Sequence, residues 1–450
     1  MGRTLRNRRR RQRGNHPLHV KTPSVSSIAQ INKQVFNKTI YDSAQTAMYI
    51  QLMKWMACNA FTGTQLQLAH FQDTGRGLKT TVDVKSGDTL LYIPSRLLIT
   101  TSTVLRSQLG PFIQKHSPPM TSQQALAIFL LYEATKGVHS MWFPYIAIIP
   151  PSYTTPAFFN QEELQLLPQN LLTLATMQIK KVRTAFKELE SCFVEIKKLR
   201  PEMDVSYERF RWAWFTVNTR CVYGKQEKLC FAEEDNCVLA PFLDLLNHSP
   251  TAEIQAGYDA SQEGYVITTD TPYKKWEQAF ICYGPHSNQT LLLEYGFIVC
   301  NNQHSSLQFH IDDIIQCIDC RVMRRYNELQ DRKLEIIREN NFQDNLCCGW
   351  DGLSWRLITA LQIMCMDQVE INDWKRVYTT DSISPHCDNQ VICLATRLLS
   401  REMQENQCVL QSIQDKMALQ ITPTDHVSLI QGLRLERQHL LQIALKQLSS

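Results

Sequence analysis

LAPFLDLLNHSP, residues 239–250, is an almost wholly apolar stretch that ends in polar side chains. The polar residues are Asp244, Asn247 and His248. So apolar a stretch is expected to be buried, and buried polar groups need hydrogen-bond partners. The stretch therefore predicts an internal polar network or a ligand site, with ordinary core packing as the plain alternative.

Two further segments place polar, aromatic and glycine residues inside apolar sequence. Asp73–Leu78 has a glycine on each side of Arg76, and Phe280–Phe297 contains Tyr283 and Tyr295, each directly followed by glycine. Glycine lets a backbone approach a ligand closely, although a tight turn explains it equally well. Each segment alone fits ordinary packing, so a functional interpretation depends on their combination.

The motifs of several large enzyme classes are absent from the sequence. It has no Walker loop, no H-E-x-x-H, no G-x-S-x-G and no G-x-G-x-x-G that opens a βαβ unit. Most nucleotide hydrolases, zinc proteases and dinucleotide oxidoreductases are therefore excluded as first interpretations.

Positive charge is concentrated at the start of the 450-residue chain. Seven arginines lie within the first thirteen residues, and without them the net charge of +4 becomes −3. No apolar core follows them, as it would in a secretory signal, so we expect an intracellular protein of the nucleus and cytoplasm. Residues 1–45 have the composition of a disordered basic arm, which favours nuclear import. Contact with nucleic acid is the alternative, but not the expected main function.

Cysteine usage and hydropathy limit the other expectations. Fifteen cysteines is an odd number, which without a signal peptide favours reduced thiols over a disulfide framework. The C-x-x-C of Cys317 and Cys320 and the adjacent Cys347 and Cys348 lack a second pair at zinc-site spacing, so we expect no metal site. Apolar runs fall short of the roughly 18 to 20 residues of a membrane span, so no transmembrane helix is expected.

Hydrophobic periodicity predicts an α+β chain. Short strand-like patterns from about residue 48 to 110, including Thr89–Ile93, precede a helical block over about 121–220, in which Val182–Ile196 has the spacing of one amphipathic helix. Strand patterns return at Gly264–Asp270 and Ala279–Tyr283. From about residue 310 the pattern is helical to the end, with Thr424 in the cap of the last helix.

In this order, the segments resemble the SET-domain methyltransferases, in the branch typified by the Rubisco large-subunit lysine methyltransferase. The matching text is Trp142-Phe143-Pro144-Tyr145 with Ile149-Pro150, Val217–Arg220, Leu243–Ser249, Tyr283-Gly284 with Ser287-Asn288, and Tyr295–Phe297. The resemblance extends from about residue 46 to the C-terminus. It implies a β-rich SET domain with a pseudoknot over 46–299, divided by a helical insertion at about 121–220. An all-α substrate-binding domain of the Rubisco-methyltransferase type is implied over 300–450.

The resemblance also implies S-adenosylmethionine as the cofactor. Residues 76–78 match the loop that cradles its methionine part, and Arg220 matches the arginine that pairs with its carboxylate, to which a guanidinium fork is well suited. Asn247 and His248 match the pair that holds its amino and adenine ends, and Phe297 would pack beside the adenine. The implied cofactor-binding residues are Arg76, Gly77, Leu78, Arg220, Asp244, Asn247, His248, Tyr283 and Phe297.

The implied reaction is direct in-line transfer of the methyl group to a lysine amine. Tyr283 matches the tyrosine whose hydroxyl orients the amine, and Tyr295 matches the second tyrosine of the substrate tunnel. A deprotonated amine must lie about 3 to 3.5 Å from the methyl group. Burial in an apolar tunnel lowers the pKa of a lysine amine, so no strong general base is required.

These features lead us to expect a protein-lysine N-methyltransferase acting on histones or on other proteins. One branch of the family methylates a histidine of actin, so a histidine methyltransferase is the alternative within the same class. The presence of both Tyr283 and Tyr295 favours lysine. A catalytically silent interaction protein, whose helical C-terminal domain recruits a partner, is the alternative from another class.

Overall fold

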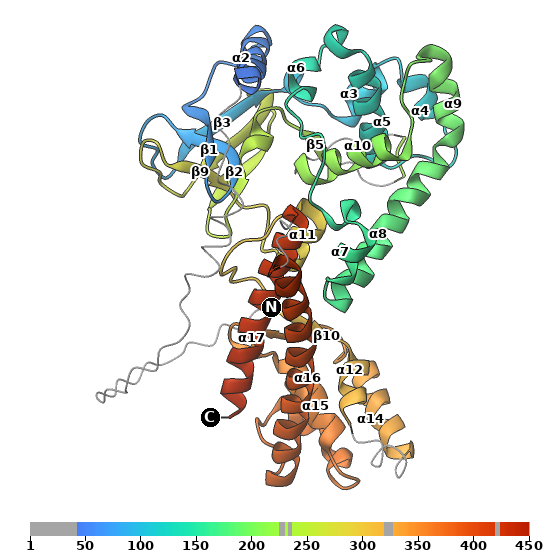
Figure 1. Cartoon of the computed structure of the whole chain (residues 1–450), viewed down its shortest axis with the longest axis vertical. Coiled ribbons are helices and arrows are strands. Elements are labelled where there is room, and N and C mark those ends of the chain that lie inside the picture. The colour runs from blue at the N-terminus through green and yellow to red at the C-terminus, as the bar shows by residue number, and fades with distance from the viewer. Residues whose placement is uncertain (1–42, 225–229, 233–235, 319–326, 419–423, 450) are drawn as a thin grey trace.

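The computed structural model describes residues 43–224, 230–232, 236–318, 327–418 and 424–449. Figure 1 shows two lobes, a sheet-containing lobe flanked by helices and a mainly helical lobe built from the C-terminal third of the chain. The predicted α+β class is confirmed. The predicted basic arm lies outside the described residues apart from 43–45, which begin the first described helix.

One four-stranded sheet brings the distant sequence motifs together. Its strands, in spatial order, are β1 (Leu66–Phe71), β2 (Gly75–Thr80), β9 (Gln278–Ile281) and β6 (Asn247–His248). The β1–β2 and β2–β9 pairs are antiparallel, whereas β6 runs parallel to β9 with Asn247 opposite Phe280 and His248 opposite Ile281. The Asn-His motif thus lies beside the strand that leads directly into Tyr283.

Two smaller sheets complete this lobe. One is antiparallel in the order β3 (Asp88–Pro94), β8 (Gly264–Thr269) and β7 (Ile254–Asp259), and the other pairs β4 (Cys221–Tyr223) with β5 (Cys237–Leu239). The strands predicted near 89–93, 264–270 and 279–283 are confirmed, although the last ends at Ile281.

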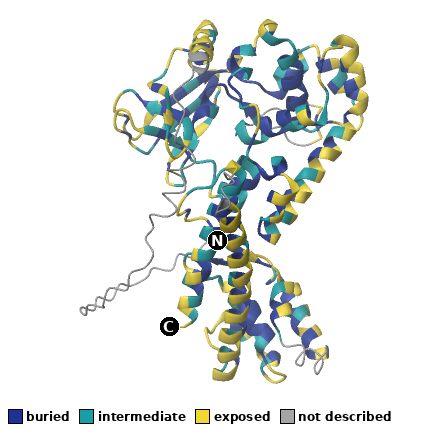
Figure 2. Ribbon diagram, viewed as in Figure 1, coloured by how far each residue is buried: buried dark blue, intermediate teal, exposed yellow. Residues whose placement is uncertain are grey.

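The chain between β3 and β4 forms helices that cover one side of the sheet lobe. They are α3 (Thr101–Arg106), α4 (Gly110–Lys115), α5 (Ser122–Thr135), α6 (Phe143–Ile146), α7 (Gln161–Gln165), α8 (Gln169–Glu188), α9 (Glu190–Leu199) and α10 (Tyr207–Arg220). Figure 2 shows that burial is greatest among α5, α10 and the adjoining strands, whereas the outer face of α8 is exposed. The single helix predicted over Val182–Ile196 is two helices, because α8 ends and α9 begins around Leu189.

The strand-like interpretation of residues 48 to 110 was wrong at both ends. Helix α2 (Ser43–Cys58) occupies the beginning, and α3 and α4 lie at the end. The α2 sequence is rich in Ala, Met and Gln, which are strong helix formers. The helix propensity of these residues therefore indicated α2, whereas a search for the alternating pattern of strands missed it.

The C-terminal lobe is helical but not all-α. Its helices are α12 (Ile311–Cys317), α14 (Asn327–Glu339), α15 (Trp355–Cys365), α16 (Pro385–Ala418) and α17 (Asp425–Leu448), the last capped as predicted by Thr424, which accepts from the Val427 N–H. A small antiparallel sheet of β10 (Leu307–Phe309), β11 (Leu346–Gly349) and β12 (Gly352–Leu353) corrects the all-α prediction. Strands of two to four residues are too short to show a period of two.

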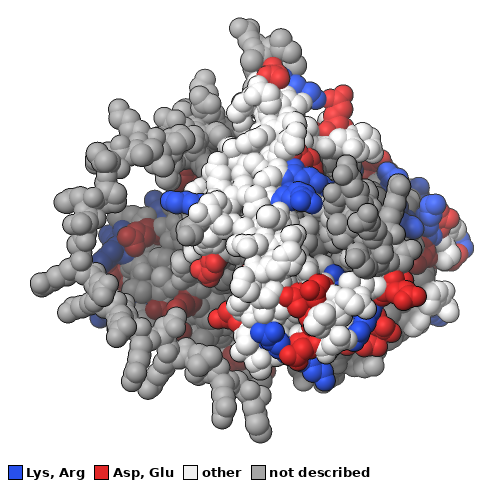
Figure 3. All heavy atoms as spheres, turned by 90° about the horizontal axis from the view of Figure 1, so that it is seen from below, with Lys and Arg blue, Asp and Glu red and all other residues white. Residues whose placement is uncertain are grey.

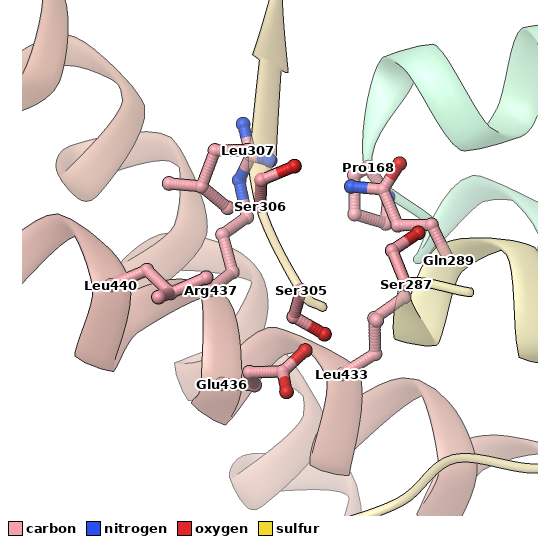
Figure 4. A pocket seen from close by; sticks show the side chains of 10 residues that line it. All are labelled: Pro168, Ser287, Gln289, Ser305, Ser306, Leu307, Leu433, Glu436, Arg437 and Leu440. Carbon is pink, nitrogen blue, oxygen red and sulfur yellow. The ribbon is translucent and has the colours of Figure 1, made fainter. Parts of the chain in front are cut away.

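A seam between the lobes holds helix α11 (Asn288–Tyr295), which ends at one of the predicted tunnel tyrosines. The seam has its own apolar core, contributed by the insertion, α11 and the C-terminal hairpin: Phe159, Leu164, Leu167, Leu171, Ala175, Leu292, Leu293, Ile413, Ile430 and Leu433. At its polar end, the Asn288 side-chain amide donates to Glu436 of α17 at 2.8 Å and to the Val299 carbonyl at 2.7 Å. Figure 4 shows the Glu436 carboxyl next to Ser305, across a narrow gap from Ser287.

The seam should make folding stability depend on pH. Burial raises the pKa of Glu436 to about 7, although hydrogen bonds from Ser305 and Asn288 oppose the rise. The folded protein keeps the Glu436 proton at pH values where the unfolded chain, with its ordinary pKa near 4.5, has released it. The stabilisation from Glu436 is therefore full below about pH 4.5 and is lost as the pH rises through about 7. Between pH 5 and 8 the wild type should lose roughly 2 kcal/mol of unfolding free energy relative to Glu436→Gln. Urea denaturation at both pH values measures this, with exposed Glu195→Gln as the control; equal pH profiles for all three proteins would contradict the prediction.

Candidate active site

The glycine-flanked arginine and the Asn-His motif meet at the start of β2. The Asn247 side-chain amide donates to the backbone carbonyl of Arg76 at 3.0 Å, and the Arg76 guanidinium donates to the Ile148 carbonyl at 2.9 Å. Leu78 is fully buried in the core, so only its backbone is available to a ligand. A Cβ on Gly77 would lie 2.7 Å from the amide nitrogens of both Asn247 and Gln278. Glycine thus keeps open a narrow space along this backbone.

A buried ion pair joins the end of α10 to the apolar stretch that opened the sequence analysis. Arg220 donates to the Asp244 carboxylate at 2.9 Å and to the Asp244 carbonyl at 3.2 Å, and the Tyr145 hydroxyl donates to the same carboxylate oxygen at 2.9 Å. The Asp244 side chain is fully buried and that of Arg220 nearly so. Burial, followed by the adjacent Asp244 charge, raises the pKa of Tyr145 well above its ordinary value, so its hydroxyl stays protonated as a donor.

His248 positions the backbone of the predicted catalytic tyrosine. Its Nδ1 accepts a hydrogen bond from the Tyr283 N–H at 3.0 Å, so its neutral ring carries the hydrogen on Nε2. Burial, and then the nearby His286 and His304, lower the pKa of His248 to about 4. The histidine is therefore a fixed neutral donor at physiological pH rather than a general acid or base.

Three aromatic rings lie together where β9 and α11 end. The ring centroids of Tyr283 and Tyr295 are 5.1 Å apart, and Phe297 lies 6.0 Å from Tyr283 and 6.2 Å from Tyr295. The Tyr283 hydroxyl donates to the Leu246 carbonyl at 2.7 Å. Burial raises the pKa of both tyrosines, so both hydroxyls are neutral. His286 is half-buried, with its ring centroid 6.1 Å from that of Tyr295.

A cavity of about 350 Å³ opens on one side of these rings. Of the predicted site residues it is lined by Arg220, Asp244, Tyr283 and Tyr295, whereas Arg76, Gly77, Leu78, Asn247, His248 and Phe297 lie outside its walls. Its remaining walls are mainly apolar and include Val222, Leu243, Leu246, Ile254, Ile267 and Ile281. The predicted residues thus form two adjoining groups, a cavity group and a β2–β6 group, joined through the His248–Tyr283 hydrogen bond.

Several buried polar atoms at this place have no hydrogen-bond partner among the described residues. They are Arg220 Nε, Asp244 Oδ1, His248 Nε2 and Gln278 Nε2. Such atoms are costly to leave unpaired unless a ligand satisfies them. Three donors and one carboxylate acceptor, next to a backbone that only glycine leaves accessible, fit a polar cofactor with both an amino-acid end and a hydrogen-bonding base.

Comparison with known proteins identifies the family to which this site belongs. The SET domain family matches residues 75–284. SET domain-containing protein 4 of Mus musculus is 37% identical over 406 residues, covering 89% of this chain and 91% of its own length. The chain belongs to the SET-domain family.

More distant similarities extend to a solved structure and to a histidine methyltransferase. The solved SET domain of LSMT with lysine and AdoHcy covers 90% of this chain and 91% of its own, with a TM-score of 0.62 and 20% identity. The actin-histidine N-methyltransferase of Danio rerio is 26% identical and covers 76% of this chain, but only 56% of its own length is matched. The chain is a SET-domain methyltransferase with the fold of LSMT, so the predicted SET fold is confirmed. The family uses S-adenosylmethionine, so the predicted cofactor is also confirmed.

Some site residues were not found from the sequence. Tyr145 was quoted only as part of a family motif, yet it is hydrogen-bonded to Asp244. Asn218, in another quoted motif, donates to the carbonyl and carboxylate of Glu294, the residue before Tyr295. Both motifs could have prompted a search for a polar partner. Among the described residues there is no cluster of side chains able to hold a metal ion, and no helix long and apolar enough to span a membrane.

Gly77→Ala should weaken cofactor binding without unfolding the sheet. The new methyl group must displace the Asn247 and Gln278 amides, which lie 2.7 Å from its position. We expect affinity for S-adenosylhomocysteine to fall about tenfold or more, equal to about 1.4 kcal/mol. Isothermal titration calorimetry tests this. The matched control is Gly257→Ala on β7, where no atom lies within 4 Å of the new Cβ. Equal affinity of both variants would show that the space beside Gly77 holds no part of the cofactor.

Proposed function

We propose that this SET-domain methyltransferase methylates lysine side chains of proteins, with S-adenosylmethionine as the methyl donor. When bound, the cofactor supplies a methyl group on an activated sulfonium. The residues of the chain need only bind, orient and desolvate the acceptor amine.

The direction of one hydroxyl hydrogen carries the proposal. Tyr283 lines the cavity, and because its hydroxyl donates to the Leu246 carbonyl at 2.7 Å, its oxygen can offer only lone pairs to a further partner. An attacking lysine amine retains N–H groups that can donate to this oxygen while its own lone pair points elsewhere. An attacking imidazole nitrogen carries no hydrogen and directs its single lone pair at the methyl group, so it has no N–H to donate to this oxygen. The site therefore favours an amine.

The walls of the cavity support the same acceptor. Among the described residues, the charged ones that line it are Arg220 and Asp244, which are paired with each other, and its aliphatic walls match the hydrocarbon stem of lysine. Burial among such walls disfavours the ammonium and lowers the pKa of a lysine amine toward the neutral form that can attack. A histidine ring is already mostly neutral at pH 7 and needs no such desolvation.

The same residues argue against a silent interaction protein. A binding module has no use for unpaired buried donors and acceptors next to the cavity, and retaining them costs stability. The acceptor lysines are proposed to belong to histones or to other proteins.

Tyr283→Phe should remove methyl transfer while leaving cofactor binding intact. The change deletes the hydroxyl oxygen that is proposed to orient the amine, so we expect activity to fall at least about 100-fold. Transfer of labelled methyl from S-adenosylmethionine into histones and whole-cell extract is measured, and the labelled amino acid is identified after hydrolysis.

The matched control for this variant is Tyr265→Phe. Tyr265 lines the same cavity, but its hydroxyl donates to the Tyr223 carbonyl, so transfer should change little. Label on lysine that depends on Tyr283 supports the proposal. Label on histidine would assign the alternative methyltransferase, and full activity of Tyr283→Phe would show that the amine binds elsewhere.

We also propose that the protein occurs in both nucleus and cytoplasm, because seven arginines crowd the first thirteen residues. On the face in Figure 3 acidic and basic side chains of the described residues are interspersed, so this face has no basic stripe for nucleic acid. Deleting residues 1–13 should shift a fluorescent fusion toward the cytoplasm and leave methyl transfer to a free peptide unchanged. An unaltered nuclear fraction would contradict the proposed import role of the arm.

A further inference from the structure

We infer that Tyr49, on helix α2 and outside the matched SET region, is a further cofactor-binding residue whose hydroxyl donates to the carboxylate at the amino-acid end of S-adenosylmethionine. The inference rests on the proposed use of this cofactor at the site, and it adds a contact that the sequence motifs do not contain.

The O–H of Tyr49 is buried and donates to no acceptor among the described residues. The residue is 8% exposed, and the Arg76 guanidinium can donate to the Tyr49 oxygen, which leaves the hydroxyl hydrogen without an acceptor. Other buried tyrosines of this lobe do find an acceptor: Tyr145 donates to Asp244, and Tyr153 to Thr216. A buried O–H without an acceptor costs free energy, so its presence calls for an acceptor beyond the described residues.

The surroundings of Tyr49 indicate the charge of that acceptor. The guanidinium of Arg76 lies 5.9 Å from the centre of the Tyr49 ring. Helix α2 packs on α6, whose Tyr145 donates to the Asp244 carboxylate paired with Arg220. Burial raises the pKa of Tyr49, while the charge of Arg76, a hydrogen bond with Arg76 and the charge of Arg220 oppose the rise, and the Asp244 charge adds to it. An acceptor for the Tyr49 hydroxyl would lie near the guanidiniums of Arg76 and Arg220, and these two positive charges favour an anion there.

The unpaired atoms match an α-amino acid in number and kind. Tyr49 Oη and Arg220 Nε are donors, and Asp244 Oδ1 is an acceptor, all three buried without a partner. A carboxylate accepts from the two donors, and an ammonium donates to the Asp244 oxygen. The amino-acid end of the cofactor has this composition, whereas its adenine end lacks both charges.

The test measures how much binding depends on the cofactor carboxylate. Isothermal titration calorimetry, with competition where binding is weak, gives the affinities of full-length protein for S-adenosylmethionine and for decarboxylated S-adenosylmethionine. The ratio of the two affinities reports the contacts made by the carboxylate alone. Tyr49→Phe keeps the ring and removes only the hydroxyl. Tyr92→Phe is the matched control, because the Tyr92 hydroxyl donates to the Gln262 carbonyl at the surface.

We expect Tyr49→Phe to lower the ratio about tenfold and to leave the affinity for the decarboxylated compound unchanged, while Tyr92→Phe changes neither. An unaltered ratio in Tyr49→Phe would overturn the inference and leave the methyltransferase proposal standing. An equal loss for both compounds would also overturn it, because the hydroxyl would then act on packing rather than on the carboxylate. Failure of the wild type to bind either compound would instead contradict the cofactor site itself.

Discussion

The parallel pairing of β6 with β9 is the constraint on which the site depends. It is only two residues long, yet it fixes which way Asn247 and His248 point. Neighbouring residues of a strand face opposite ways, so a slip of one residue would exchange their partners. In the observed register, Asn247 reaches the carbonyl of Arg76 on β2, and His248 accepts the N–H of Tyr283. One short pairing therefore joins the β2 backbone that is proposed to hold the cofactor to the tyrosine that is proposed to face the substrate.

Contacts at both ends of helix α11 fix the position of Tyr295, the second tyrosine. Asn218 of α10 holds Glu294 near its end, and the Thr154 hydroxyl donates to the Gly296 carbonyl at 2.6 Å just beyond it. Gly296 has φ +81°, and a Cβ there would lie 2.7 Å from the Thr154 hydroxyl, so the close approach requires glycine. At the other end Asn288 binds Glu436 of the C-terminal lobe. The place of Tyr295 thus depends on the insertion and on both lobes.

The sequence was informative where chemistry is concentrated in short motifs. Asp244, Asn247, His248 and Tyr283 were found because polar residues are unexpected in apolar text, and the structure places them together. What the sequence could not show is the partner of each group. Tyr145 and Asp244 are separated by 99 positions, and only packing brings them into contact. The direction of the Tyr283 hydroxyl hydrogen depends on the backbone carbonyl of Leu246, which no side-chain pattern encodes. The small C-terminal sheet was missed because its strands are shorter than the pattern that predicts them.

The buried Arg220–Asp244 pair is better explained by function than by stability. Two charges removed from water recover their desolvation cost only when all their hydrogen-bonding capacity is used, and an apolar pair of similar volume is often at least as stable. Here Arg220 Nε and Asp244 Oδ1 have no hydrogen-bond partner among the described residues, so the pair stabilises the fold less than a fully hydrogen-bonded pair would. The Tyr145 hydroxyl and the Asp244 carbonyl hold both side chains in place without using these two atoms. A fixed geometry with spare donors and acceptors is what a preorganised binding site requires, because no reorganisation then opposes the ligand. The unsatisfied atoms are therefore the cost of a site that is already assembled before its ligand arrives.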